Sequence, residues 1–125
     1  MKILILGAGR VGSSLASTLS RENYDVSIID HNKDKLLRLQ EDFDLATIIG
    51  HASHPNTLES AGADEETILL AVTSSDECNI AACQIAKSKF KVKKTICRLS
   101  DASYLDSLDA FGERNIDIAI GPEMK

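Results

Sequence analysis

The sequence predicts an α/β protein with a Rossmann-like, doubly wound parallel sheet of about six strands and helices on both faces, in three αβα layers. Three observations carry this prediction. Six short apolar runs recur along the 125 residues, segments with helical spacing alternate with them, and a G-x-G-x-x-G turn joins the first run to the first helical segment. Such alternation requires right-handed crossovers, which the Rossmann strand order satisfies most simply.

The predicted strands are short and rich in β-branched residues, as is typical of strands buried on both faces of a parallel sheet. They lie at residues 2–6, 26–30, 45–50, 67–72, 95–99 and 116–120. A chain of this length supports a single core, and no repeat or linker interrupts the pattern. We therefore expect one domain over residues 1–125.

The first two predicted helices have apolar residues at intervals of three and four, which gives each helix one apolar face. The first runs from Val11 to Leu19 and the second from Leu36 to Phe43. A third, shorter helix is predicted where Pro55 suits a first turn and Gly62 suits a C-cap.

Two further helices follow the fourth and fifth strands. Ser74 and Glu77 have the spacing of a capping box, and the segment 74–89 ends in lysines that suit a helix C-terminus. The segment 103–112 has weaker helical character and is closed by Gly112. The predicted element order is therefore βαβαβαβαβαβ.

The last residues predict more structure than the chain holds. Gly121 and Pro122 leave the sixth strand, and Pro122 with Glu123 would suit the first turn of another helix. We therefore expect the chain to be a fragment of a longer protein; the alternative is a naturally short protein with a frayed tail.

Charge and hydropathy exclude several classes of protein. The net charge of −5 is spread over stretches of mixed sign, so the chain is not expected to bind nucleic acid. No apolar run approaches the roughly 20 residues of a bilayer-spanning helix. The N-terminus also lacks the pattern of a signal peptide, and we expect a cytoplasmic protein.

Neither the cysteines nor the histidines predict a metal site. Cys78, Cys83 and Cys97 form an odd set without a C-x-x-C pair, which indicates reduced core residues. His51 and His54 have H-x-x-H spacing, but the sequence places no third and fourth ligand beside them. We interpret them as loop histidines.

The glycine turn has the pattern that cradles a pyrophosphate. Gly7 permits the tight turn, Gly9 lets the backbone approach the phosphates, and Gly12 lets the helix pack close to the strand. The N–H groups and dipole of the helix N-terminus would then meet the phosphate oxygens. Arg10 could fold over the phosphates or remain solvated.

A carboxylate stands where it can hold a ribose. Asp30 ends the second strand, 18 residues after Gly12, and could accept hydrogen bonds from the two hydroxyls of an adenosine ribose. It would repel a 2′-phosphate, which favours NAD(H) or another adenine nucleotide over NADP. The alternative is that Asp30 caps the following helix.

A doubly wound sheet binds its ligand outside the carboxyl ends of its strands. His51 and Ala52 follow the third strand, close to where adenine would lie. Thr73 and Ser74 follow the fourth strand and could contact the ligand, although Ser74 could equally be a plain N-cap. Near the end of the fifth strand stands Arg98.

Arg98 needs an anionic partner or water because it interrupts an otherwise apolar run. A ligand phosphate would supply that partner, and an ion pair with Asp76 or Asp101 is the alternative. Charge alone does not separate the two.

The residues that hydride-transfer enzymes of this fold need beside the cofactor are missing. Neither Tyr24 nor Tyr104 is followed four residues later by lysine. The chain also contains neither a G-x-S-x-G nor a G-K-[ST] motif. The glycine turn therefore favours nucleotide sensing over turnover, and no enzyme is predicted.

Several stretches together resemble the N-terminal nucleotide-binding lobes of the RCK (KTN) class, as found in the TrkA regulators of bacterial Trk potassium uptake. The most specific is "AVTSSDECN", which generic Rossmann enzymes do not share. The others are "MKILILGAGRVGSSLA", "IIDHNKDKLLRLQEDFD", "GHASHPNTLESAGADEET" and "ICRLSD".

The resemblance implies a cytosolic subunit, peripheral to the membrane, that binds NAD(H) or ATP/ADP and controls a membrane potassium transporter. It implies pairing with other copies as well, because the family continues into a crossover helix that joins two lobes. Family members bind nucleotide through the glycine turn, the acid after strand two, the Thr-Ser after strand four and the basic residue after strand five. The candidate binding residues are Gly7, Ala8, Gly9, Arg10, Val11, Gly12, Asp30, His51, Ala52, Thr73, Ser74 and Arg98.

Two alternative functions stay open. The chain could be the cofactor-binding domain of an NAD-dependent oxidoreductase, separated from its catalytic domain. It could also be an empty Rossmann scaffold that serves only in assembly.

Overall fold

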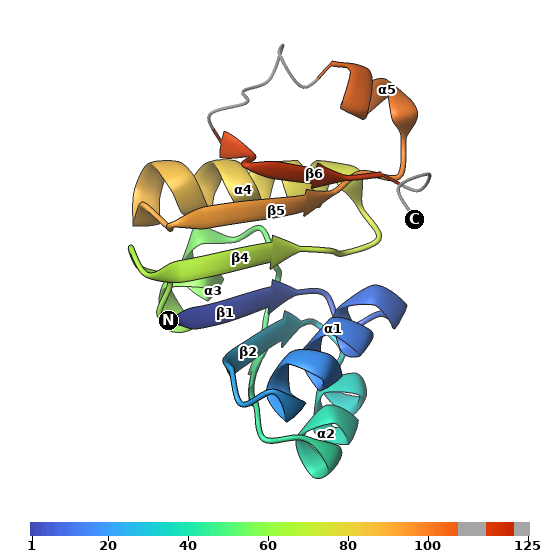
Figure 1. The fold of residues 1–125 in the computed structure, drawn as a ribbon, viewed down its shortest axis with the longest axis vertical. Coiled ribbons are helices and arrows are strands. Elements are labelled where there is room, and N and C mark those ends of the chain that lie inside the picture. The colour runs from blue at the N-terminus through green and yellow to red at the C-terminus, as the bar shows by residue number, and fades with distance from the viewer. Residues whose placement is uncertain (108–114, 122–125) are drawn as a thin grey trace.

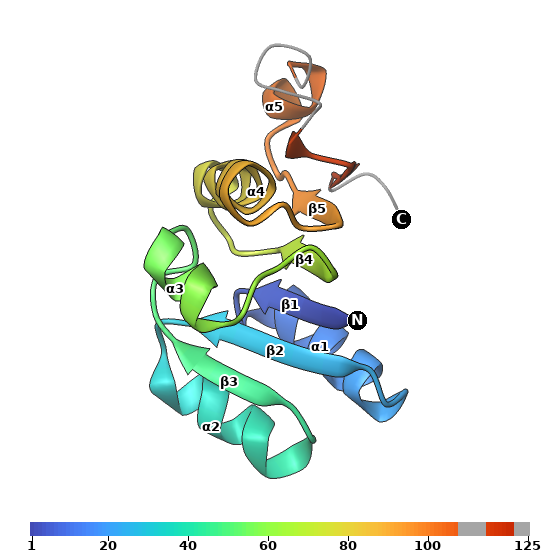
Figure 2. The same ribbon diagram turned by 90° about the vertical axis from the view of Figure 1, so that its left-hand side faces the viewer.

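A computed structural model describes residues 1–107 and 115–121 of the chain. These residues form a six-stranded, all-parallel sheet in the order β3-β2-β1-β4-β5-β6, which confirms the predicted Rossmann order (Figure 1; β3 is labelled in Figure 2). The strands are β1 (Lys2–Leu6), β2 (Asp25–Asp30), β3 (Ala46–Ile49), β4 (Thr67–Ala71), β5 (Lys94–Arg98) and β6 (Ile118–Ile120). The helices are α1 (Arg10–Arg21), α2 (Lys33–Asp42), α3 (Pro55–Ser60), α4 (Asp76–Phe90) and α5 (Ala102–Asp106).

The sheet separates two apolar cores, because its central strand β1 is buried on both faces. Leu4 and Leu6 belong to a core with residues of α3 and α4, whereas Ile3 and Ile5 belong to a core with residues of α1 and α2. Figure 2 shows these two pairs of helices on opposite sides of the sheet. The continuous apolar run of β1 is therefore explained by helices that cover both of its faces.

Two helix ends differ from the prediction. The N-cap of α4 is Ser75, whose side chain accepts the Cys78 amide, so the capping box predicted for Ser74 is wrong. The helix begins one residue later than predicted, because the extended backbone at Ser75 places the Ser75 hydroxyl over the first turn. Phe43 is the extended C-cap of α2 rather than part of that helix, and its ring packs beside Arg21.

The end of α3 lies close to where it was predicted. Ala61 is the C-cap, and Gly62 follows it with a φ of +79°, a left-handed conformation that favours glycine. The predicted closure of α5 by Gly112, and a further turn at Pro122 and Glu123, lie outside the described residues.

The prediction of reduced core cysteines is confirmed for two of the three. Cys83 and Cys97 are fully buried free thiols. The hydrogen bond with Cys97, together with burial, raises the pKa of Cys83 well above its ordinary value, so this thiol stays protonated. Cys78 is half-buried at the edge of a cleft described below.

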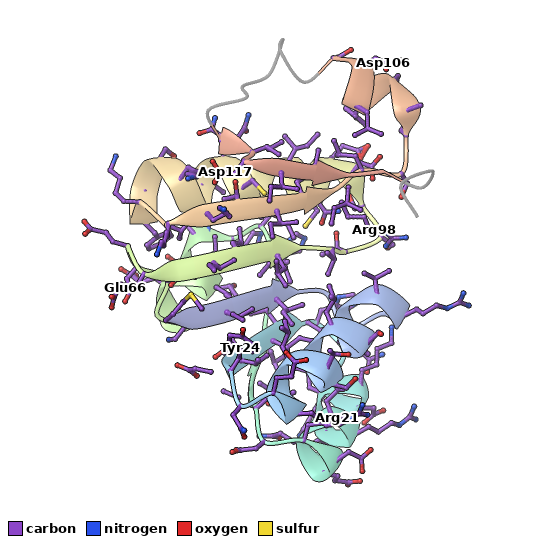
Figure 3. The ribbon with its side chains drawn as sticks, viewed as in Figure 1. Arg21, Tyr24, Glu66, Arg98, Asp106 and Asp117 are labelled. Carbon is purple, nitrogen blue, oxygen red and sulfur yellow. The ribbon has the colours of Figure 1, made fainter. Side chains whose placement is uncertain are left out.

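The strand β6 is attached through Asp117, which Figure 3 places beside α4. Its carboxylate lies 2.8 Å from Lys87 Nζ and accepts the Thr95 amide at 2.8 Å. Desolvation alone would raise the pKa of Asp117, but the hydrogen bond and charge of Lys87 and the Thr95 amide outweigh it. The pKa therefore lies below its ordinary value.

None of the helices within residues 1–107 and 115–121 combines the length and the apolarity that crossing a bilayer requires.

Replacing Asp117 with asparagine should weaken the attachment of β6, because Lys87 loses its charged partner. We expect a loss of about 1 kcal/mol in the free energy of unfolding at neutral pH. A depressed carboxylate pKa contributes stability above the unfolded-state pKa and loses it as the pH falls through the folded-state pKa. Urea unfolding of both proteins should therefore show a difference that shrinks as the pH falls from roughly 5 to roughly 2.

The control is Asp25→Asn at the start of β2, where the side chain is exposed. This variant should match the wild type at every pH. A difference for Asp117→Asn that persists in acid would contradict the role of the ion pair.

Candidate functional site

A cleft of about 930 Å³ opens at the carboxyl ends of the strands, where the strand order reverses between β1 and β4. All the predicted binding residues except Ala8 and Gly12 line it. Figure 3 places Arg98 at this end of the sheet, beside the loop that connects β4 to α4. The structure thus brings together residues from the ends of five strands.

The glycine turn between β1 and α1 forms the floor of the cleft. Gly7 has a φ of +104°, and a Cβ there would lie 2.9 Å from the Thr73 Cα atom. A Cβ on Gly12 would lie 1.7 Å from the Gly7 carbonyl oxygen. Both positions therefore require glycine for the local fold, as predicted.

Gly9 differs from the other two glycines because a Cβ there would meet nothing within 4 Å. It is the N-cap of α1 and provides no side-chain cap, so the first-turn N–H groups of that helix are left for solvent or a ligand. The backbone of the turn is thus bare on the side that lines the cleft.

Asp30 ties the end of β2 to the glycine turn. Its Oδ1 accepts the Ala8 amide at 2.9 Å, and its Oδ2 accepts the Asn32 amide at 2.8 Å. Asn32, not Asp30, caps α2, since the Asn32 side chain accepts the Asp34 and Lys35 amides. The alternative that Asp30 caps the following helix is therefore wrong.

The loop after β3 carries a pair of stacked histidines. The rings of His51 and His54 are nearly parallel, with centroids 4.4 Å apart. His51 Nδ1 accepts the Ser53 amide at 3.3 Å, and the ring lines the cleft with Ala52. Within the described residues, no group of three or more histidines, cysteines or acids is placed to hold a metal ion.

Arg98 is not engaged by either predicted carboxylate. Its Nη1 donates to the Thr73 carbonyl oxygen at 3.4 Å. Asp76 instead accepts the amides of Ser100 and Asp101, each at 2.8 Å, so the alternative of an ion pair with Asp76 is wrong.

Asp101 does not pair with Arg98 either, because its side chain caps α5. It accepts the amide and the hydroxyl of Ser103, and these hydrogen bonds lower the pKa of Asp101. The charge of Arg98 therefore has no carboxylate partner among the residues that the structure describes.

Asn79, which no sequence motif singled out, is fully buried beside the cleft. Its side chain bonds to Thr73 and to the Arg98 carbonyl. A signal for it exists in the sequence, because Asn79 precedes Cys83 and Ala86 by four and seven residues. It thus occupies a core-facing position of α4, where a polar side chain indicates a buried hydrogen-bond network.

Comparison with known proteins identifies close sequence relatives. The model of the TrkA-N domain family matches residues 3–122. The chain is 45% identical over 126 residues to the Trk system potassium uptake protein TrkA of Vibrio alginolyticus, covering 98% of this chain and 28% of that protein. It is 31% identical to a TrkA homolog of Methanothermobacter thermautotrophicus, covering 98% of this chain and 55% of that protein.

Solved structures share the fold. The TrkA-N domain of the inner membrane protein YbaL from Escherichia coli has a TM-score of 0.84 at 19% identity, over 98% of this chain and 87% of that chain. The GsuK channel bound to NAD has a TM-score of 0.75 at 19% identity, over 95% of this chain and 21% of that chain. The C-terminal domain of Kef from Shewanella denitrificans, in its AMP-bound form, has a TM-score of 0.74 at 21% identity, over 94% of this chain and 71% of that chain.

Alanine substitution should separate the roles of two glycines in the turn. Gly12→Ala places a methyl group on the Gly7 carbonyl, so α1 must move, and we expect a loss of about 3 kcal/mol in unfolding free energy. Gly9→Ala meets no atom, and its unfolding free energy should stay within about 0.5 kcal/mol of the wild type. Urea denaturation followed by circular dichroism measures both, and equal losses would contradict this account of the turn.

Proposed function

Because the chain belongs to the TrkA-N domain family, we propose that its cleft binds an adenine nucleotide, NAD(H) or ATP/ADP, and that binding regulates potassium uptake by a membrane transporter. The observation that carries the proposal is the open space beside the Gly9 backbone, which faces the cleft at an uncapped helix N-terminus. This arrangement suits a phosphate group, since N–H groups and the helix dipole both favour an anion.

Two cations would assist the phosphates. Arg10 is exposed at the start of α1, and Arg98 has its guanidinium at the opposite wall of the cleft. Arg98 donates to a neutral carbonyl and not to a carboxylate, so its charge is available to an anionic ligand. The predicted role of Arg98 as a phosphate ligand thus has support, whereas its ion-pair alternative has none.

The carboxylate of Asp30 would hold the ribose. Backbone amides already bond to each of its oxygens, which fixes the orientation of the carboxylate at the edge of the cleft. Each oxygen keeps a further lone pair for a ribose hydroxyl. A 2′-phosphate would be repelled there, which favours NAD(H) and adenine mononucleotides over NADP.

Adenine would lie on the loop after β3. His51 and Ala52 line this part of the cleft, and the His51 ring is already stacked on His54. A purine could extend this stack of flat rings. The remaining predicted contacts, Thr73 and Ser74, lie on the other side of the mouth, after β4.

The similarity to potassium uptake proteins supports the regulatory part of the proposal. The sequence relatives are potassium uptake proteins, and the GsuK channel binds NAD. The chain spans just over a quarter of the length of the Vibrio protein, so we treat residues 1–125 as one nucleotide-binding domain of a larger regulator. That regulator would act as an oligomer on the cytoplasmic face of the membrane. A nucleotide could shift it only by binding one of its conformations more tightly than the other.

Valine at position 9 should block the phosphates without unfolding the chain. A valine side chain would occupy the open space beside the turn, and we expect ADP affinity to fall by roughly a hundredfold or more. Isothermal titration of the 125-residue chain with ADP measures this effect. The unfolding free energy should remain near that of the wild type, because no atom lies within 4 Å of the added Cβ.

The same variant tests regulation in the full-length protein. If the nucleotide controls transport, Gly9→Val should remove the response of potassium uptake to ADP or NADH. Wild-type chain that shows neither heat nor a thermal shift with any adenine nucleotide would refute the proposed site. If the wild-type chain binds ADP but Gly9→Val leaves the response of potassium uptake to nucleotide unchanged, only the regulatory part is refuted.

Removing the carboxylate of Asp30 should weaken the binding of adenine nucleotides. Asp30→Ala loses its bonds to the ribose, and we expect roughly tenfold weaker ADP binding. The chain should stay folded, since two hydrogen bonds at a partly exposed site are worth only about 2 kcal/mol. Calorimetric titration measures the affinity.

The matched control is Asp25→Ala, at the other end of the same strand. Its ADP affinity should equal that of the wild type. Unchanged affinity for Asp30→Ala would show that the ribose assignment is wrong.

A further inference from the structure

Asn79 connects two segments on one wall of the cleft, the loop after β4 and the end of β5. Its Oδ1 accepts the Thr73 amide at 3.0 Å and the Thr73 hydroxyl at 2.6 Å. Its Nδ2 donates to the Thr73 carbonyl at 3.1 Å and to the Arg98 carbonyl at 2.8 Å. The amide thus uses both donors and both acceptor positions on two segments that lie 25 residues apart.

The burial of Asn79 makes these bonds a constraint on the two loops. The side chain is fully buried, so no water can replace a lost partner at low cost. None of its bonds supports α4 itself, because all four go to the residues after β4 and at the end of β5. The amide therefore fixes the position of Thr73 relative to Arg98.

The first turn of α4 holds the same region at a second point. Asp76 is 8% exposed, and its two oxygens accept the amides of Ser100 and Asp101, in the loop that follows β5. Arg98 closes the connection, since its guanidinium donates to the Thr73 carbonyl. One rigid helix turn thus positions both loops at this wall of the cleft.

We propose that Asn79 is a positioning residue of the nucleotide site, which holds Thr73 and Arg98 at the separation at which one adenine nucleotide contacts both. It touches no ligand itself. Without its amide, only Asp76 and the Arg98–Thr73 hydrogen bond hold this wall, so its two segments are less ordered. Binding must then order them at a cost in affinity. This inference rests on the proposed function.

The decisive variant is Asn79→Asp. A carboxylate can still accept the Thr73 amide, but it cannot donate to the two carbonyls, so the link to Arg98 is lost. We expect roughly tenfold weaker ADP binding by calorimetry, at a temperature where circular dichroism shows the variant folded. Asn79→Ser, which removes the amide without introducing a charge, should weaken ADP to a similar degree.

Thr95→Val is the matched control. Thr95 is also fully buried, and its hydroxyl donates to the Asn115 carbonyl at 2.7 Å, at the end of β5 opposite the cleft. This variant should lose stability but keep the ADP affinity of the wild type. If the Asn79 variants also lose only stability, Asn79 is merely structural and the inference is wrong.

A double-mutant cycle tests whether Asn79 acts through Arg98. In an Arg98→Ala background, Asn79→Asp should reduce the ADP affinity by a smaller factor than it does in the wild type. The reason is that the guanidinium that Asn79 positions is already absent. Fully additive losses would overturn the inference. Wild-type chain that binds no ADP would overturn the proposed function as well, whereas wild-type binding with an unchanged Asn79→Asp affinity would overturn this inference alone.

A test without substitution uses hydrogen exchange in the wild-type chain. Saturating ADP should slow exchange of the Thr73 amide, which Asn79 accepts, and of the Ser100 and Asp101 amides, which Asp76 accepts. The Thr67 amide, bonded to Asp64 at the far end of β4, should exchange as before. Unchanged exchange at all three sites in a chain that binds ADP would overturn the inference.

Discussion

The contact on which the site depends is the approach of α1 to the carbonyl of Gly7. Any side chain at Gly12 would place its Cβ 1.7 Å from that oxygen, so the helix can begin this close to β1 only with glycine there. The first turn of α1 then lies directly at the carboxyl end of the central strand. An uncapped helix N-terminus is thereby brought to the middle of the sheet edge.

The neighbouring strand β2 is tied to this turn by two hydrogen bonds from backbone amides. The Gly7 amide donates to the Ile29 carbonyl, and the Ala8 amide donates to Asp30. The end of β2 is thus held against the turn on one side. On the other side Gly7 packs against Thr73, so that a Cβ on Gly7 would lie 2.9 Å from the Thr73 Cα atom. The cleft lies between these two contacts because the strand order reverses at β1.

The two walls of the cleft are held by different elements. The β2 wall is held directly by the glycine turn, whose amides donate to the Ile29 carbonyl and to the Asp30 carboxylate. The wall after β4 and β5 is held by side chains from α4. The affinity of a nucleotide that contacts both walls would therefore depend on the position of α4 as well as on that of the glycine turn. Regulation by nucleotide, as proposed, requires that this position differ between the conformations of the full-length protein.

The sequence alone determined the strands, the helices between them, the strand order and the residues around the cleft, because these follow from periodicity, turn chemistry and chain connectivity. It misplaced the cap of α4 by one residue, since Ser74 and Ser75 have the same chemistry and only backbone geometry chooses Ser75. It also left the partner of Arg98 open. Only the tertiary structure decided that Asp76 binds the Ser100 and Asp101 amides and that Asn79 joins Thr73 to Arg98. These hydrogen bonds link residues far apart in sequence, and no local pattern states which buried polar group will meet which backbone amide once the strands are assembled.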